Sequence, residues 1–136
     1  MRYLGLDLGA KTLGLAISDR TGVIASFYDS IRYFDEDELV SVIKEIVEKE
    51  GIGSLVLGLP KNMNGSLGFR AEETIAFKEK LEKEIKQEVV LQDERLTTKV
   101  ATDVLIDADL SRKKRKKVID GVSAVVILQG YLDRKE

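Results

Sequence analysis

The 136-residue chain contains neither cysteine nor histidine, and these two absences exclude several kinds of chemistry. Without cysteine there is no disulfide bond and no thiol nucleophile, and without histidine there is no Ser-His-Asp triad. Ordinary zinc sites are excluded as well, because they are built mainly from these two residue types. The chemistry that remains relies on carboxylates, lysines and hard, oxygen-bound cations such as Mg²⁺ or Mn²⁺.

The sequence also lacks long apolar runs and a secretory leader. No apolar stretch approaches the roughly 20 residues that a membrane span requires. The N-terminus passes directly into a strand pattern, without the basic, apolar and cleavage regions of a signal peptide. A hydrophobic share of 43% with 34% charged residues is typical of a globular protein. We therefore expect one domain, residues 1–136, located in the cytoplasm and without a membrane partner.

The net charge of -2 gives no general sign of a nucleic-acid-binding protein, but the charge is unevenly distributed. The run RKKRKK places positive charges on adjacent residues: Arg112, Lys113, Lys114, Arg115, Lys116 and Lys117. Such a cluster creates a local electrostatic surface for a polyanion, although a solvated helix start is a plain alternative. Because the run contains no aromatic residue, we expect salt-dependent binding to a phosphate backbone rather than base reading.

Hydrophobic patterning predicts an α/β protein. Strands are expected around residues 3–8, 13–19, 22–33, 53–60 and 88–94, the first three as an antiparallel meander. Helices are expected over residues 35–51, 70–86, 97–108 and 114–133. Helices that separate the later strands imply parallel connections. The fold class is therefore a five-stranded mixed sheet, three antiparallel strands plus two parallel ones, flanked by helices.

Several acids are predicted to lie at one edge of this sheet. Ligands of open α/β sheets bind outside the carboxyl ends of the parallel strands, where Asp7, Asp93 and Glu94 are expected. A buried carboxylate is costly unless it is protonated, paired or metal-bound. Asp120 shares a helical stripe with Ala124 in a helix that is apolar on nearly every side, so it is expected to face protein.

If Asp7, Glu94 and Asp120 converge, their negative charges repel one another strongly at reduced dielectric. A divalent cation, Mg²⁺ or Mn²⁺, would relieve this repulsion, so convergence predicts a metal site. Such a site polarises a phosphoryl oxygen and generates hydroxide from water, which suits phosphodiester hydrolysis. Structural roles are the alternative: a turn contact for Asp7, an ion pair of Glu94 with Arg95, and a basic neighbour for Asp120. Asp93 is an alternative metal ligand to Glu94, since strand alternation sends the two to opposite faces.

Four segments carry a family resemblance when they occur in order: GLDLGAKTLGLAISD, LVLGLPKNMNGSLGFRAEETIAF, DERLTT and SRKKRKKVIDGVSAVVILQGYLD. Together they resemble the YqgF (RuvX) family of bacterial ribonuclease H-like nucleases. The resemblance implies a ribonuclease H-like fold, a divalent-metal site and a nuclease that matures the 5′ end of the precursor of 16S ribosomal RNA. Some members are described as resolvases of Holliday junctions. By motif, the resemblance carries the catalytic and metal-ligand roles to Asp7, Glu94 and Asp120.

Further candidate substrate-binding residues are expected at the same sheet edge: Lys11, Lys61, Asn62 and Arg95. Their side chains suit contacts to a phosphate backbone or a sugar, and an ordinary polar loop is the alternative. Tyr28, Tyr33 and Phe34 lie in and after the third strand, where core or rim packing accounts for them.

Competing functions remain at this point. The leading one is a metal-dependent nuclease on structured, pre-ribosomal RNA, with branched DNA as a close variant. The segment DLGAKTLGLA also resembles the first phosphate loop of actin and sugar-kinase ATPases, which need a second related domain. A non-catalytic RNA-binding protein is a third class. The oligomeric state, monomer or homodimer, is not indicated by the sequence.

Overall fold

The computed structural model describes residues 1–60, 68–93 and 112–135; of residues 69 and 112–121 it describes the backbone alone. The elements in chain order are β1 (Arg2–Leu8), β2 (Thr12–Ser18), β3 (Ala25–Arg32), α1 (Glu36–Glu50), β4 (Ile52–Leu59), α2 (Phe69–Glu84), β5 (Glu88–Asp93) and α4 (Arg112–Arg134). The described strands form a five-stranded sheet of order β3-β2-β1-β4-β5. The β1–β2 and β2–β3 pairs are antiparallel, and the β1–β4 and β4–β5 pairs are parallel. The expected α/β class and mixed sheet are confirmed.

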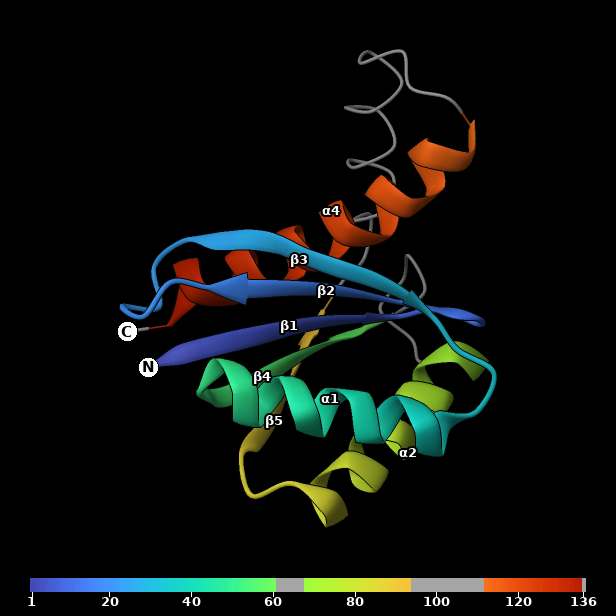
Figure 1. The fold of residues 1–136 in the computed structure, drawn as a ribbon, viewed down its shortest axis with the longest axis horizontal. Coiled ribbons are helices and arrows are strands. Elements are labelled where there is room, and N and C mark those ends of the chain that lie inside the picture. The colour runs from blue at the N-terminus through green and yellow to red at the C-terminus, as the bar shows by residue number, and fades with distance from the viewer. Residues whose placement is uncertain (61–67, 94–111, 136) are drawn as a thin grey trace.

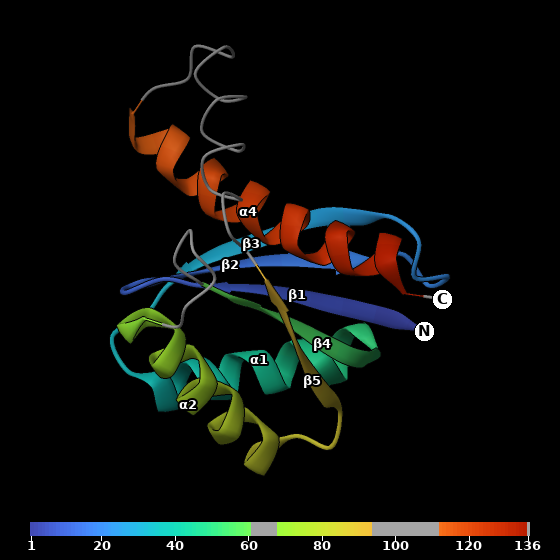
Figure 2. The same ribbon diagram turned by 180° about the vertical axis from the view of Figure 1, so that it is seen from behind.

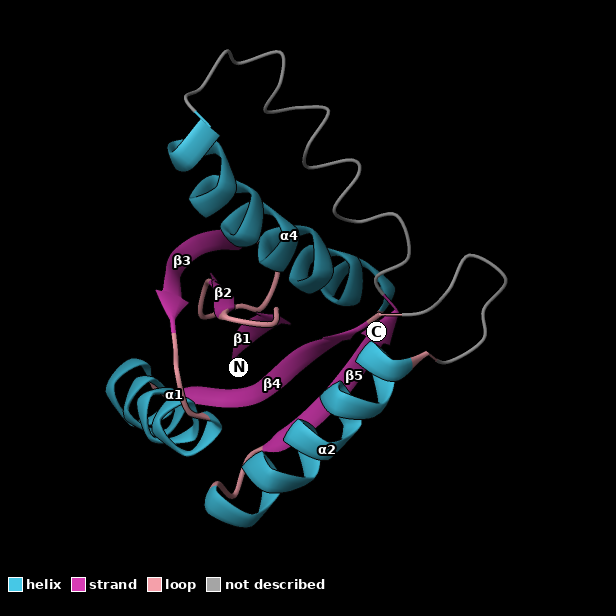
Figure 3. Cartoon of the chain, turned by 90° about the vertical axis from the view of Figure 1, so that its right-hand side faces the viewer, coloured by secondary structure: helices cyan, strands magenta, loops and turns pink. Residues whose placement is uncertain are grey.

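Helices cover both faces of the sheet (Figures 1 and 3). Helices α1 and α2 lie on one face, and α4 crosses the other. The larger core lies between the sheet and α1 and α2, and it contains buried leucines of β1 such as Leu4 and Leu6. A smaller core, which includes Val56 of β4, lies against Ala124 and Leu128 of α4. Side chains of β1 alternate between these two cores, as expected for a strand covered on both faces.

Helix α1 shows local signals that its sequence predicts. Asp35 is the N-cap, and its carboxylate accepts a hydrogen bond of 2.8 Å from the backbone N–H of Asp37. Acidic residues in the first turn complement the positive end of the helix. The helix ends at Gly51, which takes the left-handed conformation (φ 64°) and donates its N–H to the carbonyl of Val47.

Other boundaries differ slightly from the sequence pattern. Helix α2 ends at Glu84 rather than near residue 86, because Ile85 is extended and packs partly against the larger core. The helix expected at 97–108 lies outside the described residues. The expected core or rim packing is wrong for Phe34, which is 87% exposed and has the Arg32 guanidinium 5.9 Å from the centre of its ring. Among the described residues, no helix is long and apolar enough to cross a membrane.

Strand β3 begins at Ala25, three residues later than its pattern indicates, because Asp19 folds the preceding residues into a turn. The Asp19 carboxylate accepts hydrogen bonds from the backbone N–H groups of Val23 (2.8 Å) and Ile24 (3.0 Å). Gln129 of α4 then accepts from the N–H of Ala25 and donates to the carbonyl of Val23, each over 2.9 Å. The turn therefore also anchors the C-terminal half of α4 to the sheet.

Asp19 gives a testable pH dependence. Hydrogen bonds from Thr21, Ile24 and Val23 hold the pKa of Asp19 well below its ordinary value of 3.8. A lowered carboxyl pKa stabilises the fold above the unfolded-state pKa, and this contribution is lost as pH falls through the folded-state pKa. We expect Asp19→Asn to be less stable than the wild type at pH 7 and the difference to shrink below about pH 4. Urea unfolding at several pH values and constant ionic strength measures it; a difference independent of pH contradicts the assignment.

Candidate active site

Asp7 stands near the carboxyl end of β1, on the sheet face that α4 covers. The leucines of β1 belong to the core shared with α1 and α2, so strand alternation sends the residues between them to α4. The rings of Tyr3 and Tyr131 accordingly lie 5.7 Å apart. A Cβ at Gly5 would lie 2.7 Å from the Cβ of Leu128. Asp7 is the next residue in this alternation, and it is half-buried.

The contacts between β1 and α4 advance in step along the two elements, which run in opposite directions (Figure 2). The Cβ position of Gly5 also lies 3.1 Å from the carbonyl oxygen of Ala124. Two strand residues rise about 6.6 Å and one helical turn about 5.4 Å, so each step along β1 matches about one turn of α4. One further step along both elements brings Asp7 level with the α4 turn that begins at Asp120. Of Asp120 itself, only the backbone is described.

Ser123 carries a buried hydroxyl beside that turn. The residue is 1% exposed, and its Oγ has no hydrogen-bond partner among the described residues. Gly130 follows by about two helical turns on the same flank of α4, where its Cβ position lies 3.3 Å from Nε2 of Gln92 on β5. The Ser123 hydroxyl is therefore on the side of Asp120 that faces β5. An unsatisfied buried hydroxyl costs about 1–3 kcal/mol and calls for an explanation.

Strand β5 ends at Asp93, one of the two acids that the sequence leaves as alternative metal ligands. Leu91 packs against the core of α1 and α2, and Gln92 reaches α4. Alternation therefore directs Asp93, which is in register with Leu59, to the face of α1 and α2. Asp7 and Asp93 lie on opposite faces of the sheet.

The other predicted site residues are described only in part. Lys11 is exposed in the turn between β1 and β2, at the edge where Asp7 lies. Residues 112–117 form the first turns of α4, and Figure 2 shows this end of the helix rising away from the sheet. Outside the described residues lie Lys61, Asn62, Glu94 and Arg95. No three carboxylates among the described side chains come close enough to hold a metal ion.

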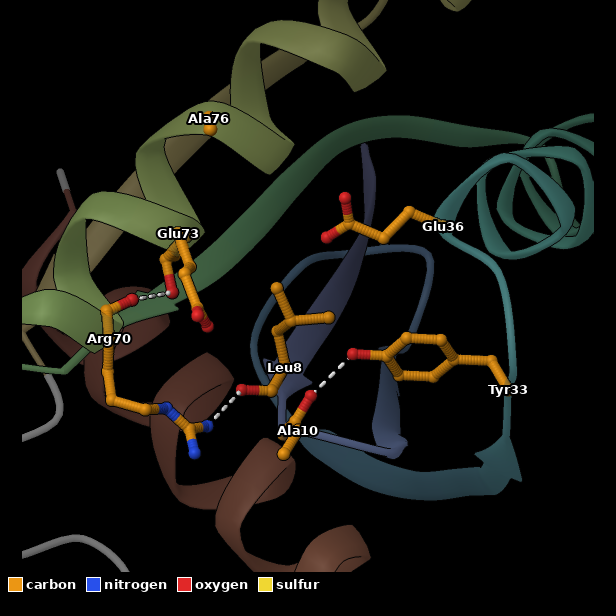
Figure 4. A pocket seen from close by; sticks show the side chains of 9 residues that line it. Leu8, Ala10, Tyr33, Glu36, Arg70, Glu73 and Ala76 are labelled. Atoms are coloured by element: carbon orange, nitrogen blue, oxygen red, sulfur yellow. Dashed lines mark hydrogen bonds between the residues drawn. The ribbon is translucent and has the colours of Figure 1, made fainter.

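A hollow of about 370 Å³ opens at the same sheet edge, on the face opposite Asp7 (Figure 4). Its walls come from the turn after β1, the segment before α1, and the first turns of α1 and α2. Glu36 and Glu73 are among the lining residues, together with Arg70 and Tyr33. No sequence pattern singles out Arg70, Glu36 or Glu73, since nothing distinguishes them from other charges on an amphipathic helix.

Two of these side chains hold the backbone at the end of β1. The Arg70 guanidinium donates to the carbonyl oxygen of Leu8 over 3.1 Å. The Tyr33 hydroxyl donates to the carbonyl oxygen of Gly9 over 2.5 Å. Burial raises the pKa of Tyr33, and the nearby Glu36 carboxylate raises it further, so the phenol keeps its proton at neutral pH. Tyr33 thus packs at the rim of the core, as expected, and also fixes the turn that follows Asp7's strand.

Two solved structures share this arrangement of sheet and helices. The Thermus thermophilus RuvC in complex with a Holliday junction substrate matches with a TM-score of 0.62, covering 97% of this chain and 94% of that chain at 13% identity. The fowlpox virus resolvase in complex with Holliday junction DNA matches with a TM-score of 0.61, covering 98% and 97% at 15% identity. The likeness defines the class of the fold, which is ribonuclease H-like.

Sequence comparison defines the family. The family model described as "RuvX: Holliday junction resolvase" matches residues 1–134. A Clostridium acetobutylicum protein is 47% identical over 133 residues, 98% of both chains. A Geobacillus kaustophilus protein is 51% identical over 137 residues, 99% of both chains. Both relatives carry the name "Putative pre-16S rRNA nuclease". The chain therefore belongs to the RuvX family, as the resemblance of its four segments predicted.

Proposed function

We propose that this protein is a divalent-metal-dependent nuclease that hydrolyses phosphodiester bonds in nucleic acid. The observation that carries the proposal is the register between β1 and α4, which leads from Asp7 to the Asp120 turn at the carboxyl edge of the sheet. Membership of the RuvX family and close relatives named as nucleases support the same reaction.

In this proposal Asp7, Glu94 and Asp120 hold the cation. Carboxylate oxygens are hard donors that suit Mg²⁺ and Mn²⁺, and the chain has no histidine or cysteine to favour a softer metal. The Ser123 hydroxyl, which has no hydrogen-bond partner within the described part of the chain, lies beside the Asp120 turn, and this fits a site that receives an ion with its water or a phosphate. When bound, the cation would polarise a phosphoryl oxygen and lower the pKa of the attacking water.

We assign the third ligand to Glu94 rather than Asp93 on strand alternation. Gln92 reaches α4, which covers the face of Asp7. Glu94 itself lies outside the described residues, and strand alternation continued beyond Asp93 predicts that it returns to this face. Asp93 alternates to the face of α1 and α2, where it would not share a cation with Asp7.

The basic residues would position the substrate. Lys11 lies at the edge that carries Asp7, and residues 112–117 occupy the projecting turns of α4 that precede Asp120 (Figure 2). In this proposal the two groups neutralise successive phosphates on either side of the cleaved bond, with Lys61, Asn62 and Arg95 as further contacts. Binding then weakens steeply as salt rises, because condensed counterions are released from the nucleic acid.

The proposed substrate is the precursor of 16S ribosomal RNA, because relatives of 47% and 51% identity are named as its nuclease. Cleavage at the 5′ end of that precursor is what the family resemblance of the four segments implies. A four-way DNA junction is the second candidate. It is favoured by the description of the matching family model and by the junction complexes of the two fold neighbours.

Incubation with both substrates, in Mg²⁺, in Mn²⁺ and in chelator, tests the proposal. A metal-dependent nuclease cleaves at least one substrate only when the cation is present, and the relative rates identify RNA or DNA as the preferred one. Nucleic acid that is bound equally well in chelator, with neither substrate cleaved in either cation, identifies a passive binding protein instead.

Ser123 offers a readout that does not depend on cleavage. Ser123→Ala removes an unsatisfied buried hydroxyl, so we expect the unfolding free energy in chelator to rise by about 1 kcal/mol. Loss of a hydroxyl beside the cation site should at the same time weaken Mn²⁺ binding about tenfold, as for other groups that support metal ligands. Urea unfolding and Mn²⁺ titration of both proteins measure the two effects. An unchanged Mn²⁺ affinity removes Ser123 from the site.

A further inference from the structure

The hollow at the end of β1 has the size and walls of a binding site that the proposed hydrolysis does not itself use. Its volume of about 370 Å³ falls within the range of ligand pockets, about 300–1,000 Å³. Figure 4 shows the carboxylates of Glu36 and Glu73 extending toward the space above Leu8 from opposite sides, one from α1 and one from α2. The Tyr33 hydroxyl points to the turn at the rim of the same space.

Hydrogen-bonding capacity decides which kind of group this hollow accepts. The carboxylates of Glu36 and Glu73 are hydrogen-bond acceptors. Two cations offset part of their charge: Arg70, which lines the hollow and donates to the carbonyl oxygen of Leu8 over 3.1 Å, and Lys80, whose Nζ lies 4.0 Å from Oε1 of Glu36. A phosphate that entered between the two carboxylates would meet only acceptors, whereas a neutral group would find partners there for its N–H donors. The hollow therefore suits an uncharged, donor-bearing ligand.

Position narrows the choice of ligand. The hollow begins at Leu8 and Gly9, and Gly9 follows Asp7 by two residues, at most about 7 Å of extended backbone. A nucleic-acid strand cleaved at Asp7 would therefore pass beside the opening. Proteins that read single-stranded nucleic acid take splayed bases into such spaces, stack them on aromatic rings and bind their edges.

We infer that the hollow receives one unpaired nucleobase with an exocyclic amine, and that Glu73, together with Glu36, accepts hydrogen bonds from that amine. The inference rests on the proposed nuclease function, since the base belongs to the strand that passes Asp7. Carboxylates accept from the N4 amine of cytosine in known base contacts. Uracil has nearly the same shape but presents a carbonyl oxygen at that position, which would face the carboxylates as a second acceptor.

The test compares two RNA probes of equal length and charge, the fluorescently labelled hexamers of cytidine and of uridine. Binding is measured by anisotropy in chelator at one salt concentration, so that no cleavage occurs. We expect the wild type to bind the cytidine hexamer about tenfold more tightly, within the range of discrimination that one good base contact gives.

Three variants identify the hollow as the source of the preference. Glu73→Gln should reduce the ratio of the two affinities to about one- to twofold, since it removes the charged acceptor. Ala76→Leu, at an exposed lining position, should do the same by filling the space. Glu79→Gln is the matched control on the same helix and should keep the wild-type ratio.

Equal wild-type affinities for the two hexamers, or a preference unchanged in both Glu73→Gln and Ala76→Leu, would overturn the inference. Neither binding result tests the proposed nuclease activity, which is measured separately by cleavage of the precursor RNA and of the four-way junction. A cytidine preference that depends on Glu73 in a protein that cleaves neither substrate would retain the base-binding hollow and reject the nuclease.

Discussion

Asp7→Asn is expected to lower the cleavage rate on the preferred substrate by about 10³-fold or more, because loss of one cation ligand removes several kcal/mol of transition-state stabilisation. Asparagine keeps the size of the side chain and removes its charge, so the fold and the binding of nucleic acid should persist. Single-turnover cleavage of precursor 16S RNA and of a four-way junction, in Mg²⁺ and Mn²⁺, measures the effect.

Asp29→Asn is the matched control for this experiment. Asp29 is exposed on β3, the edge strand farthest from β5, and the substitution makes the same change in charge. The control should cleave at the wild-type rate. Cleavage that survives in Asp7→Asn would reject the proposed mechanism, whereas loss of cleavage with retained binding and folding supports it.

Gly5→Ala is expected to destabilise the protein by about 2–3 kcal/mol, in the upper part of the range for overpacked interiors. The added Cβ would lie 2.7 Å from the Cβ of Leu128 and 3.1 Å from the carbonyl oxygen of Ala124. Both atoms are close to or within the α4 backbone, so the helix itself must move. Urea unfolding measures the loss, and cleavage should fall too, because the Asp120 turn shifts relative to Asp7.

Gly130→Ala provides the contrast on the same helix. Its nearest neighbour would be Nε2 of Gln92 at 3.3 Å, the far end of a flexible side chain that can move aside. Alanine is also preferred over glycine inside a helix by about 0.5–1 kcal/mol. We expect unchanged or slightly raised stability. If Gly5→Ala and Gly130→Ala lost equal amounts of unfolding free energy, close packing of α4 on β1 would not be the reason that position 5 requires glycine.

Local chemistry explains which parts of the fold the sequence predicts well. The N-cap at Asp35, the acidic first turn and the left-handed Gly51 all act within a few residues, so the bounds of α1 are nearly those expected. Strand β3 begins later than its hydrophobic pattern predicts, because the Asp19 carboxylate accepts hydrogen bonds from backbone N–H groups four and five residues further along the chain. Hydrophobic alternation carries no information about such a side-chain contact.

The candidate site likewise contains residues that the sequence predicts and features that depend on the tertiary structure. Asp7 is identified by its residue type alone, because a carboxylate among buried leucines needs a partner. The proposed preference for Glu94 over Asp93 depends on the tertiary structure, in which Gln92 lies on the α4 side of the sheet and Asp93 alternates to the other side. The hollow that involves Glu36, Glu73 and Arg70 has no sequence signal, since it forms only where α1, α2 and the turn after β1 meet.

By itself, the sequence predicted the class of chemistry, the order of the described helices and strands, and the family, because residue types and short-range periodicity are properties of the chain. Only the tertiary structure decided which faces of the sheet Asp7 and Asp93 occupy, that the buried Ser123 hydroxyl has no hydrogen-bond partner among the described residues, and that a hollow adjoins the end of β1. These features depend on strand register and on the crossing of α4, which join residues far apart in the sequence.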